Sequence, residues 1–280
     1  MESIPVTPTT PPAPWLGGKS KLAATIVPLI ASIPHTTYVE PFFGMGGVFF
    51  RRRLKPRAEV INDRSTELFN FFRQLQQHYQ ALLDCMKWQL TFRSEFDRLV
   101  EMDPLKLTEL QRAARFIYLQ KLAFGGKSDG QAFGVFGERP ARFDITNLTD
   151  TLEQLHQRLS SVTIENLDWR EVLPRYDRPD ALFYLDPPYW NCENDYGKGM
   201  FARDDFTDMA ALLADIQGRF IISLNDVPDV REIFAAFTIR AVSTSYSIAK
   251  TSNQRVREVL ISNGPLDDPQ GDLLGVPGAK

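Results

Sequence analysis

The clearest chemical motif follows the apolar run Leu182–Leu185 and consists of Asp186, Pro187, Pro188 and Tyr189. A buried strand would here deliver a carboxylate, two prolines and an aromatic ring at its carboxyl end. Asp186 and the Pro187 carbonyl are both acceptors, and proline stiffens the loop without adding an N–H donor. Together they could hold the two N–H donors of a planar exocyclic amine, with Tyr189 stacked on the attached ring. The alternative is a proline-terminated strand with a packed aromatic, which the position after a buried strand disfavours.

Three further motifs suit a nucleoside-like ligand: Trp15–Lys19 (WLGGK), Glu40–Gly47 (EPFFGMGG) and Val60–Asp63 (VIND). Glycines let the backbone approach a ligand closely. An acidic residue that ends a strand commonly accepts hydrogen bonds from ribose hydroxyls. Lys19 could face a carboxylate, and Trp15 could line the pocket. Each motif also has a structural reading, as a glycine turn, a helix cap at Asp63 or Ser65, or an exposed lysine.

The elements that must position these motifs follow the pattern of an α/β fold with a largely parallel sheet, since short apolar runs alternate with amphipathic stretches. The expected strands are Thr37–Glu40, Glu59–Asn62, Val162–Asn166, Leu182–Leu185, Phe220–Leu224, Thr238–Val242 and Glu258–Ile261. The expected helices beside them are Lys19–Ile30, Gly47–Leu54, Met209–Ile216 and Val230–Ala236. Open sheets of this kind bind ligands outside the carboxyl ends of their strands.

The gap between the strand that ends near Asp63 and the strand that begins near Val162 is too long for a single crossover. Its pattern is mainly helical, over Glu67–Gln80, Glu95–Val100, Glu109–Leu122 and Leu148–Leu159. Within it, aromatics alternate with Gly, Ser and Asp over Phe124–Phe136, which indicates a hairpin or mobile loop. We therefore predict a core of residues 15–66 and 162–263 and a helical insertion of residues 67–161, with a hairpin or loop near 124–143.

The two ends of the chain, residues 1–14 and 264–280, are rich in proline and have no periodic pattern, so both are expected to be flexible tails. No apolar run approaches the roughly 18–20 residues of a transmembrane helix. The two cysteines are far apart, which favours reduced thiols in a cytoplasmic protein. Three scattered histidines give no zinc pattern, and no metal is expected.

The net charge of −3 argues mildly against indiscriminate binding of polyanions. A local basic face can nevertheless serve on an acidic protein. Its candidates are Arg51, Arg52, Arg53, Lys55 and Arg57, together with Lys121, Lys127, Arg139 and Arg142. Solvated helix faces are the alternative reading for each of them.

Taken together and in this order, WLGGK, EPFFGMGG, IND and DPPYW resemble the motifs of the Dam-like, D12 class adenine-N6 DNA methyltransferases. The later segments fit as well. Phe220–Asp226 (FIISLND) is similar to the family's strand ending in SNxD, and Ser247–Ser262 to its closing segment. The resemblance runs discontinuously from Trp15 to Asn263, and the ordered set is far more specific than any one motif.

The resemblance implies a Rossmann-like S-adenosylmethionine-dependent methyltransferase core with a helical target-recognition insertion. It implies S-adenosylmethionine as cofactor, double-stranded DNA as partner, and direct methyl transfer to the N6 amine of an adenine rotated out of the duplex. The implied catalytic residues are Asp186, Pro187, Pro188 and Tyr189. The implied cofactor-binding residues are Trp15, Lys19, Glu40, Phe42, Gly44, Asp63, Asp168 and Asp186.

The recognition hairpin departs from the family pattern. GATC-specific members carry a segment resembling NGLxRxN, whereas residues 124–131 here read FGGKSDGQ, so GATC specificity is not predicted. We expect DNA contacts from Lys127, Ser128, Gln131, Arg139 and Arg142, with a solvated glycine loop as the alternative. The segment resembles versions in prophage-encoded adenine methylases. That likeness indicates a bacterial or phage source and a restriction–modification setting, and a monomer is expected because no interface stripe stands out.

Two classes of alternative remain. An amino-methyltransferase could act on cytosine N4, on adenine in RNA or on a protein amide. Asp186 favours adenine, because cytosine enzymes more often carry Ser at this position and protein amide enzymes often Asn. A catalytically silent DNA-binding module would keep the same fold, but the intact DPPY motif and Lys19 disfavour it.

Overall fold

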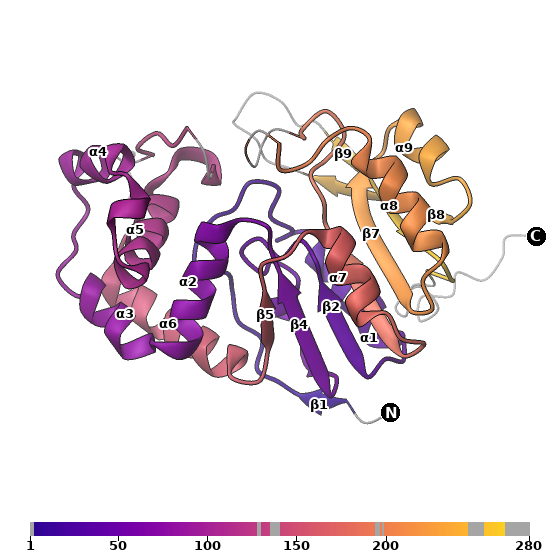
Figure 1. Cartoon of the computed structure of the whole chain (residues 1–280), viewed down its shortest axis with the longest axis horizontal. Helices are drawn as coiled ribbons and strands as arrows, with labels where there is room; N and C mark the ends of the chain where they lie inside the picture. The colour runs from indigo at the N-terminus through magenta and orange to yellow at the C-terminus, as the bar shows by residue number, and fades with distance from the viewer. Residues whose placement is uncertain are drawn as a thin grey trace, which may run out of the picture.

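The computed structural model describes residues 3–127, 130–134, 141–193, 197, 199–245 and 255–266. Its main strands are β2 (Thr37–Glu40), β4 (Ala58–Asn62), β5 (Thr163–Glu165), β6 (Ala181–Leu185), β7 (Arg219–Asn225), β8 (Thr238–Ser245) and β9 (Arg255–Ser262). They form one seven-stranded sheet in the order β5-β4-β2-β6-β7-β9-β8 (Figure 1). The strands from β5 to β7 are parallel, and β9 runs antiparallel to both of its neighbours. The predicted α/β class and all the predicted strands are confirmed.

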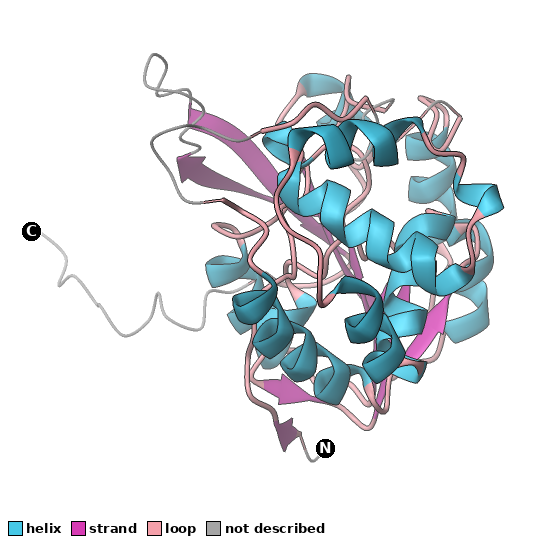
Figure 2. Ribbon diagram, turned by 90° about the vertical axis from the view of Figure 1, so that its left-hand side faces the viewer, coloured by secondary structure: helices cyan, strands magenta, loops and turns pink. Residues whose placement is uncertain are grey.

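The helices are α1 (Ala23–Ser32), α2 (Thr66–Gln77), α3 (Tyr79–Met86), α4 (Arg93–Glu101), α5 (Glu109–Leu122), α6 (Ile145–Leu159), α7 (Trp169–Tyr176), α8 (Asp205–Ala214) and α9 (Pro228–Ile233). Helices α2 to α6 lie between β4 and β5 in the chain and gather beside the sheet, at the left of Figure 1 and facing the viewer in Figure 2. In the described part of the chain, none of the helices is both long and apolar enough to cross a bilayer.

The sheet carries a hydrophobic core on each face, because side chains alternate along a strand. On β6, Leu182 and Tyr184 belong to one cluster, and Phe183 and Leu185 to the other, which is built with α7, α8 and α9. The first cluster also contains buried residues of α1 and of all five helices α2 to α6. The helical segment therefore shares its core with one face of the sheet and is held firmly against it.

Side-chain caps set where several helices begin. Ser65 accepts a hydrogen bond from the Leu68 N–H at the start of α2, immediately after the strand that ends in Asn62. Helix α5 begins with a capping box, in which Thr108 and Gln111 satisfy each other's backbone N–H groups. These caps fix the residues at which α2 and α5 begin.

The N-terminal segment differs from the prediction of a flexible tail. A short strand β1 (Ile4–Pro5) pairs antiparallel with β3 (Leu54–Lys55). The Thr9 N–H donates to the Phe50 carbonyl at 2.7 Å, and Thr9 itself is buried. Proline-rich sequence has no helical or alternating pattern, yet it packs here as an extended strap, so the prediction is wrong for residues 3–14.

The predicted helix over residues 47–54 is also wrong. The chain forms only a 3-10 turn (Phe49–Arg51) and then extends into β3. The backbone becomes extended at Arg52. The Arg52 guanidinium lies 3.8 Å from the centre of the Tyr38 ring and forms an ion pair with Glu59. Burial of this charged side chain overrides the local helical pattern.

Smaller differences concern element ends. Helix α1 begins at Ala23 rather than at Lys19, which leaves Lys19 in the turn before it. Helices α3 and α7 were not predicted. At the C-terminus Leu266 is buried against the core, and residues 267–280 of the expected tail lie outside the described residues.

A buried ion cluster joins the sheet to α6 and yields a stability test. Glu59 binds Arg52 at 2.7 Å and Arg158 through both of its oxygens at 2.6 and 2.7 Å, and all three side chains are under 9% exposed. We expect Glu59→Ala to lower the free energy of unfolding by about 3–5 kcal/mol, because it leaves two buried guanidinium groups without their carboxylate.

The matched control is Glu95→Ala, which removes the solvent-exposed pair with Arg98 and should cost under about 1 kcal/mol. Denaturant unfolding of both variants measures the difference. Equal losses in the two variants would show that the buried cluster contributes no more than a surface pair.

Candidate active site

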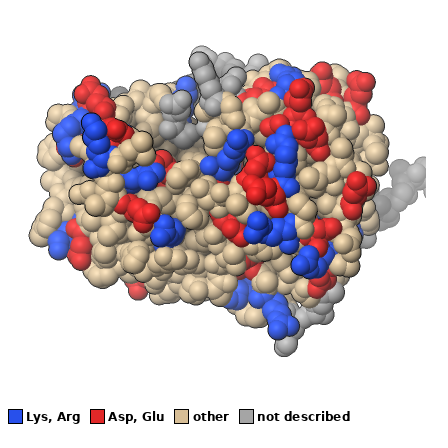
Figure 3. Space-filling view, viewed as in Figure 1, with Lys and Arg blue, Asp and Glu red and all other residues tan. Residues whose placement is uncertain are grey.

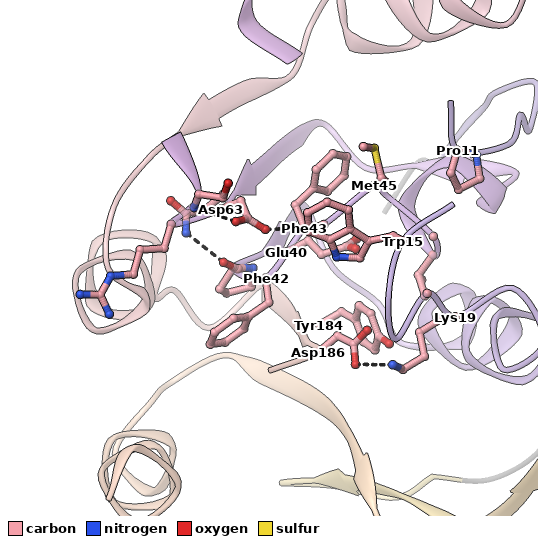
Figure 4. A pocket seen from close by; sticks show the side chains of 18 of the residues that line it. Pro11, Trp15, Lys19, Glu40, Phe42, Phe43, Met45, Asp63, Tyr184 and Asp186 are labelled. Atoms are coloured by element: carbon pink, nitrogen blue, oxygen red, sulfur yellow. Dashed lines mark hydrogen bonds and ion pairs between the residues drawn. The ribbon is translucent and has the colours of Figure 1, made fainter. Parts of the chain in front are cut away.

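A cavity of about 500 Å³ opens where β2, β4 and β6 end (Figure 4). Glu40 and Asn62 reach it as the last residues of β2 and β4, and Asp186 follows β6 directly. The structure gathers the following residues from the predicted ligand site around this one cavity: Trp15, Lys19, Glu40, Phe42, Gly44, Asp63, Asp186 and Pro188. Parallel strands make this possible, because their carboxyl ends meet at one edge of the sheet.

Asp186 is held at the inner end of the cavity by two donors. The Lys19 ammonium lies 2.7 Å from Asp186 Oδ1, and the Ser223 hydroxyl donates to the same oxygen at 2.9 Å. Burial raises the pKa of Asp186, while Lys19 and Ser223 favour the charged form and lower it. Lys19 is only 3% exposed, also donates to the Gly17 carbonyl at 2.8 Å, and lies 4.5 Å from the centre of the Tyr189 ring. It therefore pairs with Asp186, and a contact of Lys19 with a ligand carboxylate stays a prediction.

Two strands beyond β6 position the loop that follows Asp186. The Tyr189 hydroxyl donates to the buried Glu258 of β9. Asn225, at the end of β7, accepts from the Trp190 N–H at 2.9 Å and donates to the Trp190 carbonyl at 3.1 Å. Sequence reasoning noted the segments that contain Ser223, Asn225 and Glu258 but not these roles, which depend on strand order and register.

Asp63 marks the other end of the cavity in Figure 4. Its two oxygens accept hydrogen bonds from the Gly44 and Ser65 N–H groups, each at 2.9 Å. Burial raises the pKa of Asp63 to about 6, against these two bonds, which lower it. Gly44 has a φ of +51°, and a Cβ there would lie 2.8 Å from Nε1 of Trp15. Glycine is therefore required for the turn and for the packing of the Trp15 ring.

Glu40 lies between these two ends and is 2% exposed. The Tyr38 hydroxyl donates to its Oε2 at 2.9 Å. Burial nevertheless raises the pKa of Glu40 to about 8. The carboxyl is therefore largely protonated at neutral pH and can donate a hydrogen bond as well as accept one.

Comparison with known proteins identifies the family of this chain. The model of the D12 class N6 adenine-specific DNA methyltransferases matches residues 15–248, which is most of the chain and contains the whole cavity apart from the segment before Trp15. The chain belongs to this family. The enzyme is therefore an adenine-specific DNA methyltransferase, and the resemblance of its motifs is confirmed.

Individual relatives are distant but cover most of the methyltransferase. It is 26% identical to the type II methyltransferase M1.LlaDCHI of Lactococcus lactis subsp. cremoris over 89% of this chain and 93% of the relative. It is 23% identical to the type II methyltransferase M.CviBI of Paramecium bursaria Chlorella virus NC1A over 80% and 85%, respectively. With the DNA N-6-adenine-methyltransferase of Escherichia phage P1 it shares 24% identity over 79% of this chain and 30% of the phage protein.

Of the predicted cofactor-binding residues, Asp168 does not line the cavity, and of the predicted catalytic residues, Pro187 and Tyr189 do not line it either. The Asp168 carboxylate caps α7 by accepting from the Arg170 N–H at 3.0 Å, and it pairs with the Arg64 guanidinium at 3.4 Å. Its neighbours Leu167 and Trp169 line the cavity instead. We assign Asp168 a capping role, which is the common function of Asp before a helix.

The predicted DNA contacts lie in and beside the loop after α5. Lys127 is exposed, but the Gln131 amide donates to Gln120 Oε1 at 3.2 Å and to the Lys127 carbonyl at 3.0 Å. Gln131 is thus engaged within the loop. Arg142 donates to the Ala123 carbonyl at 3.4 Å. The remaining two candidates, Ser128 and Arg139, lie outside the described residues.

Basic side chains that the prediction did not place in the site also reach the cavity of the methyltransferase. Arg51, from the 3-10 turn before β3, and Lys121, from α5, both line the cavity, and burial lowers the pKa of each. On the face drawn in Figure 3, acidic and basic side chains are interspersed over the described residues rather than gathered in one basic stripe. No group of three or more His, Cys, Asp or Glu among the described residues is arranged to hold a metal ion.

The raised pKa of Glu40 yields a pH test. The pKa of Glu40 is 4.5 in the unfolded chain and about 8 in the folded protein. The free energy of unfolding therefore falls as the pH rises between these two values, because the folded protein holds the proton more tightly. We expect Glu40→Gln to gain stability relative to the wild type by about 2–3 kcal/mol between pH 6 and pH 8. Denaturant unfolding of both proteins at each pH measures this difference. The subtraction removes the contribution of all other titrating groups, because both proteins share them. A difference that stays constant with pH would contradict the raised pKa.

Proposed function

We propose that the methyltransferase takes its methyl group from S-adenosylmethionine bound in the cavity described above. The cavity volume of about 500 Å³ lies within the range of about 300–1,000 Å³ typical of small-molecule sites. Trp15 and Phe42 supply aromatic walls, and Asp63 offers acceptors for ribose hydroxyls at the end of β4. When bound, the sulfonium cofactor supplies an activated methyl group.

The observation that carries the catalytic assignment is the state of the Asp186 carboxylate. Within the described residues, Lys19 and Ser223 both bind Oδ1, so Oδ2 remains available to accept an N–H of the adenine N6 amine. The Pro187 carbonyl can accept the second N–H. An amine held in this way has its lone pair directed at the methyl group rather than delocalised into the ring.

The remaining steps need positioning rather than a covalent intermediate. The adenine must leave the duplex to reach a buried carboxylate, which makes base flipping part of the proposal. Tyr189, fixed through Glu258, can stack on the extruded base. In the transfer, the N6 nitrogen would bond to the methyl carbon as the carbon–sulfur bond breaks, which leaves S-adenosylhomocysteine. The proton of the methylated amine would pass to the Asp186 carboxylate that holds it and then to water. Alignment of the reactants supplies most of the rate increase.

The helices α2 to α6 and the loop after α5 are proposed to recognise DNA. Lys127 is exposed on this loop, and Lys121 lies at the end of α5 where it meets the cavity. The names of the relatives support a role in restriction–modification or in a prophage, within the cytoplasm of a bacterial or infected cell. A monomer suffices for this role, since every group named here comes from one chain.

The test compares two aspartates that each follow a strand of the sheet, Asp186 after β6 and Asp168 after β5. We expect Asp186→Ala to lower methyl transfer to DNA more than about 100-fold, because it removes the acceptor that orients the amine. Asp168→Ala should lose about 1 kcal/mol of stability as a missing helix cap and keep activity within about threefold. Transfer of labelled methyl from S-adenosylmethionine to mixed-sequence DNA is the measurement. Retention of more than about a tenth of the activity by a folded Asp186→Ala variant would refute the assignment.

A further inference from the structure

Gln120, near the end of α5, connects three segments from a position with no solvent exposure. Its Nε2 donates to the Pro14 carbonyl at 2.8 Å and to the Gly126 carbonyl at 2.7 Å. Its Oε1 accepts from the Gln131 amide at 3.2 Å. The Gln120 amide nitrogen therefore binds both the strap before Trp15 and the loop after α5, and the amide oxygen binds the loop alone.

The loop and the strap also touch directly through their backbones. The Leu16 N–H donates to the Gly126 carbonyl at 3.0 Å. Gly126 has a φ of +72°, and a Cβ there would lie 3.0 Å from the backbone of Pro14 and Trp15. With Gln120 beneath this contact, the strap cannot shift against the loop without breaking hydrogen bonds that water cannot easily replace.

On the cavity side, the strap continues into the wall of the proposed cofactor site. The Trp15 ring packs on Gly44, and the Trp15 carbonyl accepts from the Gly18 N–H at 3.0 Å in the turn that leads to Lys19. On the opposite side, the Gln131 amide that binds Gln120 also holds the carbonyl of the exposed Lys127. Gln120 thus lies between the proposed DNA contact and the proposed cofactor contact.

We propose that Gln120 is a positioning residue that couples DNA binding at the loop (residues 124–127 and 130–134) to cofactor binding in the cavity. DNA that orders the loop around Lys127 fixes the Gly126 carbonyl, and Gln120 transmits that order to Pro14 and Trp15. By thermodynamic linkage, each ligand then tightens the binding of the other by the same factor. The inference rests on the proposed function, which supplies both ligands.

The experiment measures the dissociation constant of S-adenosylhomocysteine, which cannot donate a methyl group, by calorimetry. It is measured with and without sonicated DNA from an adenine-methylase-null bacterium, which carries unmodified sites of every sequence. We expect DNA to tighten binding at least about fivefold in the wild type. In Gln120→Leu, which keeps the size of the side chain and loses its polar atoms, we expect this factor to fall below about twofold.

A matched control separates coupling from general damage. Gln76 in α2 also donates to two backbone carbonyls, those of Leu159 and Val162, at 2.7 and 2.8 Å, and it does not line the cavity. Gln76→Leu should lose comparable stability and keep the wild-type coupling factor. Gln131→Leu removes the bonds of Gln131 to Gln120 Oε1 and to the Lys127 carbonyl but keeps the Gln120 bonds to Gly126 and Pro14. It should weaken coupling, while its affinity for S-adenosylhomocysteine without DNA stays unchanged.

Gln120→Glu provides a second route if the leucine variant does not fold. It keeps the shape and the acceptor but cannot donate to both carbonyls, so the coupling factor should again fall. An unchanged factor in either Gln120 variant, or an equal loss in Gln76→Leu, would overturn the inference. Failure of the proposed function is distinguishable, because the wild type would then bind no S-adenosylhomocysteine or would methylate no DNA.

Discussion

The rest of the site depends on one buried carboxylate, that of Asp186. Burial opposes its charge, so the fold must bring donors to it from elements that are distant in sequence. Lys19 comes from the turn before α1, and Ser223 comes from β7, the strand beside β6. Both donors favour the charged form against burial, and because both bind Oδ1, the other oxygen of Asp186 has no hydrogen-bond partner among the described residues. The turn before α1, the strand order and the loop after β6 all serve this arrangement.

The sheet explains why the remaining groups gather around that carboxylate. Since β4, β2 and β6 are adjacent and parallel, Asp63, Glu40 and Asp186 all reach the same edge. The antiparallel β9 then brings Glu258 to Tyr189 from the far side. Helices α2 to α6 share a hydrophobic core with one face of the sheet, which places α5 and its loop at the cavity. DNA recognition and catalysis would thus share one hydrophobic core.

Much of this arrangement was predictable from local sequence, and the exceptions have physical causes. Apolar runs bounded by polar turns predicted every main strand, and the motifs supply nearly half of the residues that line the cavity. The helix expected around Arg52 failed because a buried ion cluster with Glu59 holds the chain extended. Partners such as Glu258 depend on register across strands, which local patterns do not contain. Likewise, Gln131 binds Gln120 rather than pointing outward to DNA, because the loop contacts the end of α5, and local patterns do not contain this contact.

The most direct measurement is modification-sensitive sequencing of plasmid DNA from an adenine-methylase-null host that expresses this protein. The membership of the family, the buried Asp186 and the cavity beside it together require N6-methyladenine in a recurring sequence context. We expect such a context to appear in cells with the wild type and to be missing with Asp186→Ala. Folded wild-type protein that binds S-adenosylmethionine yet leaves every adenine unmodified would contradict DNA adenine as the acceptor.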